Sequence, residues 1–175
     1  ISDVPLGLFL SGGIDSSIVC GLMAGISDKP VETFSIGFKE ASFDETSYAR
    51  CVAQAFATHH HERILYASEC ADILPDVVSR MDVPMADASV APTWLLSKVK
   101  REKVTVALGG DGSDELWAGY EHYIGFALAQ KYRSLPRFLR KGILEPLCRR
   151  LPASHGYINL NLAAHNFLCA AAQPA

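Results

Sequence analysis

The fold of this chain is decided by the stretch Leu6-Gly7-Leu8-Phe9-Leu10-Ser11-Gly12-Gly13-Ile14-Asp15-Ser16-Ser17. Its first five residues are almost all apolar and predict a short buried strand. Apolar residues then recur at helical spacing: Ile18, Val19, Leu22, Met23 and Ile26. A glycine pair between a strand and a helix lets backbone N–H groups approach an anion closely, and the start of the helix adds positive potential. The stretch therefore predicts a strand, an anion-binding turn and a helix.

The turn differs from two well-known phosphate-binding loops. Its spacing is too short for a Walker A loop, and no lysine precedes the hydroxyl residues. It also lacks the complete G-x-G-x-x-G pattern of dinucleotide-binding folds. The carboxylate of Asp15 fits beside a bound phosphate only where a metal ion bridges the two. The alternative is an ordinary glycine turn in which Asp15 or Ser16 caps the helix.

The composition is that of a globular domain. The chain has 175 residues, of which 49% are hydrophobic and 20% are charged, and its net charge of -3 argues against general nucleic-acid binding. We expect no membrane span and no signal peptide. Five cysteines without C-x-x-C spacing predict a reducing, cytoplasmic environment with neither a zinc site nor a disulfide framework. These are Cys20, Cys51, Cys70, Cys148 and Cys169.

Strand and helix patterns alternate along the chain. A capping box of Ser42 and Glu45 predicts the start of a second helix, which extends through Phe56. Further strands are expected over 31–38, 60–66 and 104–108, and further helices over 68–81 and 92–101. Strands separated by helical crossovers imply an α/β fold with a doubly wound parallel sheet. The missing Met at position 1 and the lack of a closing element suggest a piece of a longer protein.

A second glycine-rich turn, Gly109-Gly110-Asp111-Gly112-Ser113-Asp114-Glu115, follows the predicted fourth strand. In parallel sheets ligands bind beyond the carboxyl ends of the strands, so both turns should meet at one edge. Mg²⁺ prefers one or two protein carboxylates, completed by phosphate oxygens and water. We therefore predict Asp15 and Asp114 as magnesium ligands, and Asp111 as the group that positions or deprotonates a nucleophile. As an alternative, Asp114 caps a helix through Leu116 and Tyr120.

Three other features permit both a functional and a structural interpretation. His59, His60 and His61 could bind zinc, but neighbours on a strand point to opposite faces, which favours a polar entrance to a strand. Trp94, Trp117 and Tyr120 could line a pocket, although core packing is commoner. The basic residues between 131 and 150 form either a lip for pyrophosphate or, as we favour, a solvated helical surface. We expect a core domain over 1–127 and the start of a helical, basic extension over 128–175.

The stretch Ser11–Ser17 resembles the pyrophosphate loop of the PP-loop ATP pyrophosphatase superfamily, whose fold is adenine nucleotide alpha hydrolase-like. The surrounding sequence resembles the synthetase domain of glutamine-dependent asparagine synthetases. Together the matching pieces cover residues 2–123 in order. They are 2–7, 33–38, 43–45, 87–93, 106–115 and 119–120.

The resemblance implies roles for individual residues. Ser11, Gly12, Gly13, Asp15, Ser16 and Ser17 would hold the phosphates of ATP and the departing pyrophosphate. Leu10, Ile36 and Gly110 would surround the adenosine, together with Gly109, where the family often has serine. Asp15 and Asp114 match the magnesium-binding acids. Asp111 matches an acidic position, often glutamate, that is associated with the ammonia-dependent step. The loop over 81–91 is more similar to relatives that amidate other carboxylates.

The implied reaction is attack of a substrate carboxylate on the α-phosphate of ATP, after which ammonia displaces AMP to form an amide. Aspartate is the default substrate, and the ammonia would come from glutamine through a glutaminase domain of the same longer chain. The family also allows a homodimer. A second possibility is an amidotransferase or lactam-forming enzyme acting on another carboxylate. A tRNA-modifying PP-loop enzyme fits less well, because thiolases use paired cysteines and usually lysine at the position of Ile14. An ATP-binding scaffold without catalysis is disfavoured by the three aspartates.

Overall fold

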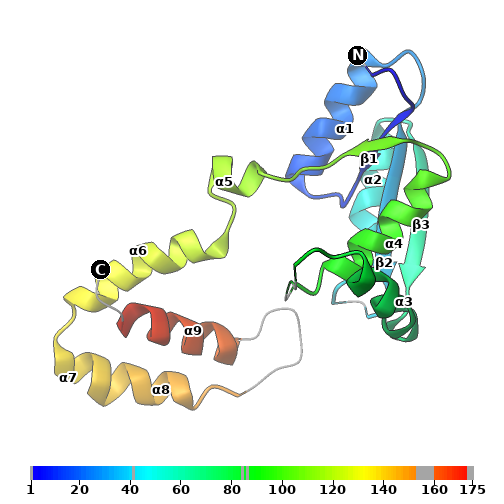
Figure 1. The fold of residues 1–175 in the computed structure, drawn as a ribbon. Coiled ribbons are helices and arrows are strands. Elements are labelled where there is room, and N and C mark those ends of the chain that lie inside the picture. The colour runs from blue at the N-terminus through cyan, green and yellow to red at the C-terminus, as the bar shows by residue number, and fades with distance from the viewer. Residues whose placement is uncertain (1, 41, 84, 86, 153–159, 173–175) are drawn as a thin grey trace. The chain divides into compact units, whose positions relative to one another are not determined.

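The computed structural model describes residues 2–40, 42–83, 85, 87–152 and 160–172, and the chain divides into two compact units, 1–111 and 112–175 (Figure 1). The first unit contains a four-stranded sheet in the order β3-β2-β1-β4, and every neighbouring pair is parallel. Its strands are β1 (Leu6–Phe9), β2 (Glu32–Phe38), β3 (His59–Leu65) and β4 (Val106–Leu108). The predicted parallel α/β fold is confirmed.

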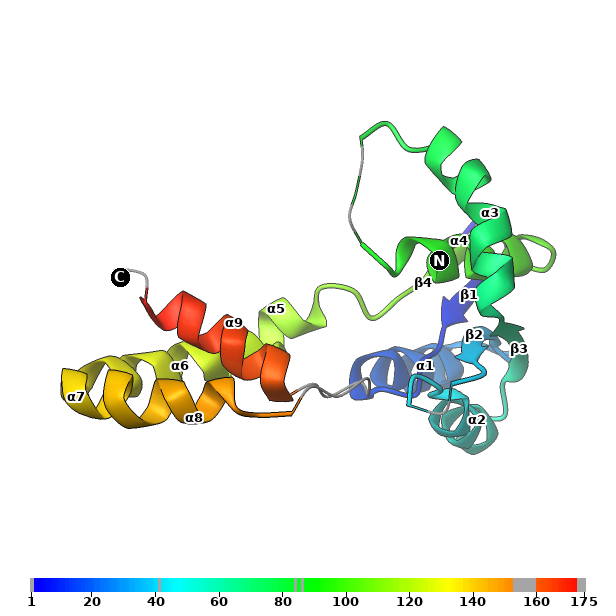
Figure 2. The same cartoon turned by 90° about the horizontal axis from the view of Figure 1, so that it is seen from below.

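Helices cover both faces of this sheet. Figure 2 shows α1 (Ile14–Ile26) and α2 (Thr46–Ala55) on one face, with α3 (Ala67–Ser79) and α4 (Val90–Arg101) on the other. The chain moves outward from β1 to β3 and then returns to add β4 on the opposite side of β1. The sheet is therefore doubly wound, and its strand order reverses between β1 and β4. In open α/β sheets this reversal is the place where ligands bind.

The core lies between β1 and the helices α1 and α2. Its buried residues are Leu8, Leu10, Cys20, Val31, Ala49 and Ala53. The apolar residues that were predicted at helical spacing divide between two faces of α1: Val19 and Met23 pack against this core, whereas Ile18, Leu22 and Ile26 are exposed. Two of the five expected apolar residues thus anchor the helix.

The element boundaries differ slightly from the sequence prediction. The expected capping box is wrong, because α2 begins at Thr46 and no side chain of Ser42 caps it. Instead the carboxylate of Asp44 accepts hydrogen bonds from the backbone N–H of Thr46, at 3.3 Å, and from its hydroxyl, at 3.0 Å. The helix starts later because Asp44 supplies the acceptor that the first turn needs. Helix α3 extends through Pro75.

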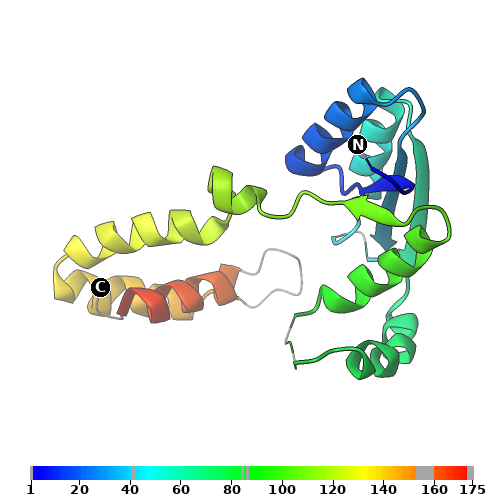
Figure 3. The same ribbon diagram turned by 45° about the horizontal axis from the view of Figure 1, so that its top comes forward.

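The second unit is helical. It contains α5 (Ser113–Trp117), α6 (Glu121–Ser134), α7 (Arg137–Leu139), a π-helical turn (Arg140–Leu144), α8 (Glu145–Arg149) and α9 (Leu160–Ala172). Figure 3 shows α6 and α9 side by side. None of the helices within the described ranges is long and apolar enough to cross a lipid bilayer.

Part of the basic segment makes internal contacts. The Arg133 guanidinium donates to the backbone carbonyls of Ala171, at 3.1 Å, and Ala170, at 3.4 Å, in the last turn of α9. The Arg140 guanidinium lies 5.5 Å from the centre of the Tyr132 ring. These two residues therefore stabilise the unit rather than form a solvated surface. The proposed domain boundary at 127/128 stays a prediction.

Candidate functional site

The first glycine turn continues directly from the carboxyl end of β1. The backbone N–H of Leu10 donates to the carbonyl of Phe34 at 2.8 Å, so strand pairing extends one residue past β1. The Leu10 side chain is buried in the core, with 1% of its surface exposed. Any ligand at this edge would therefore meet the main chain of Leu10 and not its side chain.

Gly12 fixes the turn against α2. Its backbone has a φ of +85°, a conformation that glycine adopts without steric cost. A Cβ at this position would also collide with the backbone N of Ala49 and with atoms of Tyr48. The absence of a side chain thus permits both the left-handed turn and the close approach of the loop to α2.

The N-terminus of α1 has no side-chain cap among the described residues, and Gly13 occupies the N-cap position. The interpretation of Asp15 or Ser16 as an ordinary cap is therefore wrong. The Ser16 and Ser17 hydroxyls donate to the Gly13 carbonyl at 3.2 and 2.6 Å, and the Ser11 and Ser16 hydroxyl oxygens lie 3.0 Å apart. An uncapped first turn leaves N–H groups for an anion, and rotation of the hydroxyls would add further donors.

The second glycine turn packs onto the first one. A Cβ at Gly110 would lie 3.1 Å from the Cβ of Asp15 and 3.2 Å from the backbone N of Ser16. Because β1 and β4 are neighbours, both turns emerge where the strand order reverses. The structure therefore brings together residues from both predicted loops.

Asp111 lies next to Gly109 in the same turn. A Cβ at Gly109 would collide with the Asp111 carboxylate, so this carboxylate folds back over the glycine. A serine at this position would occupy that space. Ile36 is half-buried near the carboxyl end of β2, where it is in register with Arg63 of β3.

Asp114 belongs to the second unit, in the short helix α5. The N-cap of this helix is Gly112, with a φ of +86°, so the interpretation of Asp114 as the cap is wrong. The helix ends at Trp117, because Ala118 turns into the left-handed conformation with a φ of 56°. Trp117 is 78% exposed in the structure, against the core position that we expected.

The sequence pattern did not predict a pair across the end of α5. The Tyr120 hydroxyl donates to the Glu115 carboxylate at 2.7 Å. This hydrogen bond is the main cause that raises the pKa of Tyr120 to about 12, and it also lowers the pKa of Glu115. The sequence signal for this pair is a tyrosine that follows a glutamate by five residues, across the end of a helix.

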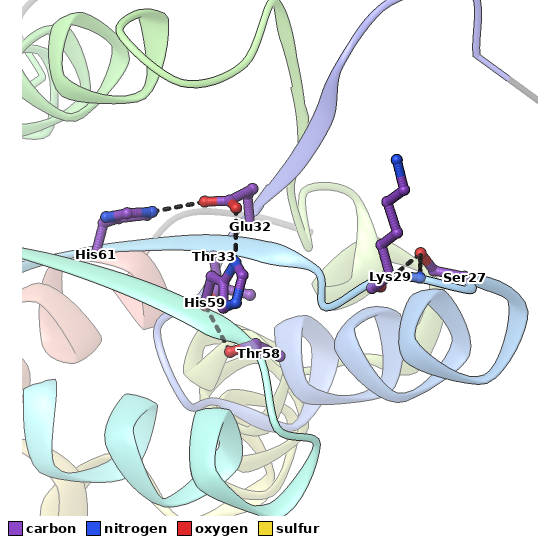
Figure 4. A network of polar contacts seen from close by, with 7 residues as sticks. All are labelled: Ser27, Lys29, Glu32, Thr33, Thr58, His59 and His61. Carbon is purple, nitrogen blue, oxygen red and sulfur yellow. Dashed lines mark hydrogen bonds and ion pairs between the residues drawn. The ribbon is translucent and has the colours of Figure 1, made fainter.

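The histidine run lies at the opposite, amino end of β2 and β3. Figure 4 shows the Glu32 carboxylate between two histidines, with contacts of 3.0 Å to His59 Nδ1 and 2.6 Å to His61 Nε2. Burial alone would raise the pKa of Glu32, but the hydrogen bonds from His61 and His59 outweigh it and lower the pKa. His60 points to the other face, with 3.0 Å to Thr33 and 3.2 Å to Ser35. The alternation predicted for a strand is confirmed.

Metal-binding clusters of three or more His, Cys, Asp or Glu side chains do not occur in the described part of the chain. A magnesium site of two carboxylates, completed by phosphate oxygens and water, is smaller than such a cluster. A separate cavity of about 570 Å³ lies among β3, α3 and α4. Trp94 lines it, with the Lys98 ammonium 5.1 Å from the centre of the indole.

Comparisons with known proteins identify a family that matches this chain. The asparagine synthase family model matches residues 1–173. A putative glutamine-hydrolysing asparagine synthetase of Methanocaldococcus jannaschii is 41% identical over 140 residues, which cover 79% of this chain and 27% of that protein. Asparagine synthetase 1 of Bacillus subtilis is 36% identical over 144 residues, which cover 82% of this chain and 23% of that protein.

A solved structure, the NH3-dependent NAD synthetase of Campylobacter jejuni, superposes with a TM-score of 0.45 at 19% identity, covering 99% of this chain and 90% of that one. The chain spans about a quarter of the length of the two synthetases, at 27% and 23%. The family match extends over both loops and both units. By this match over nearly its whole length, the chain belongs to the asparagine synthase family.

Proposed function

We propose that the protein catalyses the ATP-dependent, AMP-forming amidation of a carboxylate. The observation that supports this most is the contact between the two glycine turns, in which Gly110 approaches Asp15 and Ser16 at the reversal of the strand order. An anion-binding helix N-terminus and an acidic turn thereby share one edge of the sheet. The arrangement suits a phosphorylated nucleotide that loses pyrophosphate.

The residues of the two glycine turns and of the nearby strands offer contacts for both the phosphates and the adenosine of ATP. The uncapped first turn of α1 supplies N–H groups for the phosphates, and the hydroxyls of Ser11, Ser16 and Ser17 lie within the same loop. Gly109, Gly110, Ile36 and the main chain of Leu10 are the proposed neighbours of the adenosine. Gly12 and Gly13 give the first glycine turn its shape. The nucleotide would thus lie along the carboxyl edge of β2, β1 and β4.

Asp15 and Asp114 are the proposed magnesium ligands. Two carboxylates with phosphate oxygens and water satisfy the octahedral preference of Mg²⁺. When bound, the ion would neutralise charge on the departing pyrophosphate. Asp111 is the proposed catalytic residue of the second half-reaction, in which its carboxylate would orient ammonia or accept its proton.

Aspartate is the proposed substrate, and ammonia from glutamine is the proposed nitrogen donor. Relatives that carry the words glutamine-hydrolysing in their names are about four times longer than the matched region. A glutaminase domain elsewhere in the full-length protein would account for the donor. A second candidate is amidation of a different carboxylate, because the loop over 81–91 resembles that of relatives that amidate other carboxylates.

The test is ATP–pyrophosphate exchange in the full-length protein. We expect exchange that needs Mg²⁺ and a carboxylate substrate, with Asp15→Ala and Asp114→Ala each reducing the rate by about a hundredfold or more. Asp28→Ala removes an exposed acid from the loop after α1 and serves as the matched control. A panel of carboxylates, starting with aspartate, would identify the substrate.

Asp111→Asn separates the two half-reactions. We expect it to retain exchange and to lower amide formation from ammonium salts by about a hundredfold. Equal losses of exchange and amide formation would contradict a separate role for Asp111. Normal exchange in both Asp15→Ala and Asp114→Ala would contradict the metal assignment.

A further inference from the structure

The side chain of Thr46, the first residue of α2, packs against the carboxyl end of β2. Thr46 is only 2% exposed, and a Cβ at Gly37 would lie 2.5 Å from its Cγ2 atom and 2.7 Å from the Cδ1 atom of Ile64. The missing side chain of Gly37 therefore lets α2 approach the strand closely. Gly37 directly follows Ile36, a proposed neighbour of the adenosine. The start of α2 thus packs on the strand end that supplies the adenosine half of the proposed site.

The same turn of α2 also packs against the first glycine turn. A Cβ at Gly12 would collide with the backbone N of Ala49 and with atoms of Tyr48. Ala49 is 1% exposed and belongs to the core. Because Thr46 and Ala49 are three residues apart, they are neighbours on one face of the helix. The first turn of α2 therefore links β2 directly to the loop that is proposed to hold the phosphates.

The carboxylate of Asp44 fixes where this turn begins. Its Oδ1 atom accepts the backbone N–H of Thr46 at 3.3 Å, and its Oδ2 atom accepts the Thr46 hydroxyl at 3.0 Å. Oδ1 would also lie 2.9 Å from a Cβ at Gly37, so the carboxylate contacts the strand as well as the helix. The N-cap residue Glu45 makes no side-chain capping bond within the described part of the chain. Asp44 thus supplies the acceptor for the start of α2.

We propose that Asp44 is a positioning residue for the nucleotide, which acts through α2 on both halves of the site. Loss of its two hydrogen bonds would let the first turn of α2 shift, and the contacts of that turn with Gly37 and Gly12 would shift together. Small displacements of groups that position a substrate have large effects on binding and rate. This inference rests on the proposed function only in that ATP is the ligand. It assigns Asp44 to the affinity for ATP and not to the affinity for the carboxylate substrate.

The role needs a hydrogen-bond acceptor and not a negative charge. An asparagine at position 44 keeps one oxygen for the Thr46 N–H, and its NH₂ group can donate to the Thr46 hydroxyl. Asparagine and aspartate also serve equally well at the start of a helix. A metal ligand, by contrast, would need the carboxylate itself. Asp44→Asn should therefore restore what Asp44→Ala loses.

The test compares these two variants in the full-length protein. Equilibrium dialysis with Mg²⁺ and without a carboxylate substrate measures the Kd of ATP, and ATP–pyrophosphate exchange measures the KM of ATP and of aspartate. We expect Asp44→Ala to raise the Kd and the KM of ATP by about tenfold and the KM of aspartate by less than about twofold. Asp44→Asn should stay within about twofold of the wild type in all three constants.

Glu69→Ala is the matched control, because it removes the same kind of contact from a different helix. The Glu69 carboxylate accepts the backbone N–H of Tyr66 at 3.1 Å, at the start of α3. This variant should lose stability and keep the ATP affinity of the wild type. Thr46→Val provides a second site should Asp44→Ala not fold. It keeps the backbone bond to Asp44 and loses the hydroxyl bond, so the Kd of ATP should rise by about threefold.

Four outcomes would overturn the role of Asp44. They are an unchanged Kd of ATP in Asp44→Ala and Thr46→Val, an equal rise in the KM of ATP and of aspartate, an equal loss of ATP affinity in Glu69→Ala, and a loss in Asp44→Asn as large as in Asp44→Ala. A wild type that binds ATP without exchange would contradict the proposed reaction, while the Kd values would still decide the role of Asp44. A wild type that binds no ATP would overturn both.

Discussion

At the scale of single residues, Gly12 and Gly13 have different reasons to be glycine. Gly12 needs a φ of +85° and a close approach to Ala49 and Tyr48, whereas Gly13 has a φ of -66° that any residue adopts. A Cβ at Gly13 would meet only the Ser11 hydroxyl, at 3.3 Å. Gly12 is thus needed for packing, whereas Gly13 keeps the backbone accessible.

This difference predicts unequal effects on stability. Gly12→Ala should lower the free energy of unfolding by about 2 kcal/mol or more, because it combines a strained φ with a collision against α2. Gly13→Ala should cost less than about 1 kcal/mol. Urea denaturation without nucleotide measures both variants, and equal losses would show that the loop does not pack on α2 as described.

Gly109 determines where the carboxylate of Asp111 can lie. Gly109→Ser would push this carboxylate out of the space that it occupies over the glycine. We expect amide formation to fall by about tenfold or more while ATP–pyrophosphate exchange changes less. Gly125→Ser in α6, where a Cβ would meet nothing within 4 Å, is the control. An unchanged rate of amide formation in Gly109→Ser would argue that the folded-back position of Asp111 has no role.

At the scale of elements, the seam between β2 and β3 contains a polar cluster on each face. Glu32, His59 and His61 lie on one face, and Thr33, Ser35 and His60 on the other. Thr33 is fully buried, and its hydroxyl lies 2.8 Å from that of Thr58. These contacts satisfy buried polar groups and specify the register of the two strands.

Burial lowers the pKa of His60 below its usual value of 6.5. Between the folded pKa and about 6.5 the unfolded chain binds a proton that the folded chain does not, so stability should rise with pH in this window. The stabilisation is complete above about pH 6.5 and is lost as the pH falls. Urea denaturation of the wild type and His60→Asn at pH 5.5 to 7.5 measures this dependence.

The His60→Asn curve should be flatter than the wild-type curve in that window. Glu32 also has a lowered pKa, and its contribution to stability is likewise lost as the pH falls, but only through the acidic range below 4.5. The two effects therefore occur at different pH values. Parallel curves for the wild type and His60→Asn would exclude His60 as the source of the pH dependence.

At the scale of the whole molecule, the reactivity of the cysteine thiols tests the packing of the fold. Cys20 lies in the core, fully buried, and burial raises the pKa of its thiol. Cys51, on α2, is exposed. We expect Cys51 of the full-length protein to react with a maleimide under native conditions, and Cys20 to react only on global unfolding. Rapid native labelling of Cys20 would contradict the packing of α1 on β1.

Much of this architecture follows from local sequence. The apolar run before Ser11, the glycine pair and the β-branched residues before Gly109 predict strands and turns from side-chain chemistry alone, and alternation with helices predicts a parallel sheet. The ordered matching pieces over residues 2–123, among them Ser11–Ser17 and Gly109–Glu115, then indicate the family. These features are readable because they depend on neighbours in the chain.

Tertiary structure alone decided two other features. It placed Gly110 against Asp15 because β4 pairs with β1, a contact between residues far apart in the sequence. It also turned Ile18 and Leu22 outward while Val19 faced the core. Periodicity shows that a helix has apolar residues, but only packing determines which of them meet the core, because burial depends on partners brought together by the fold.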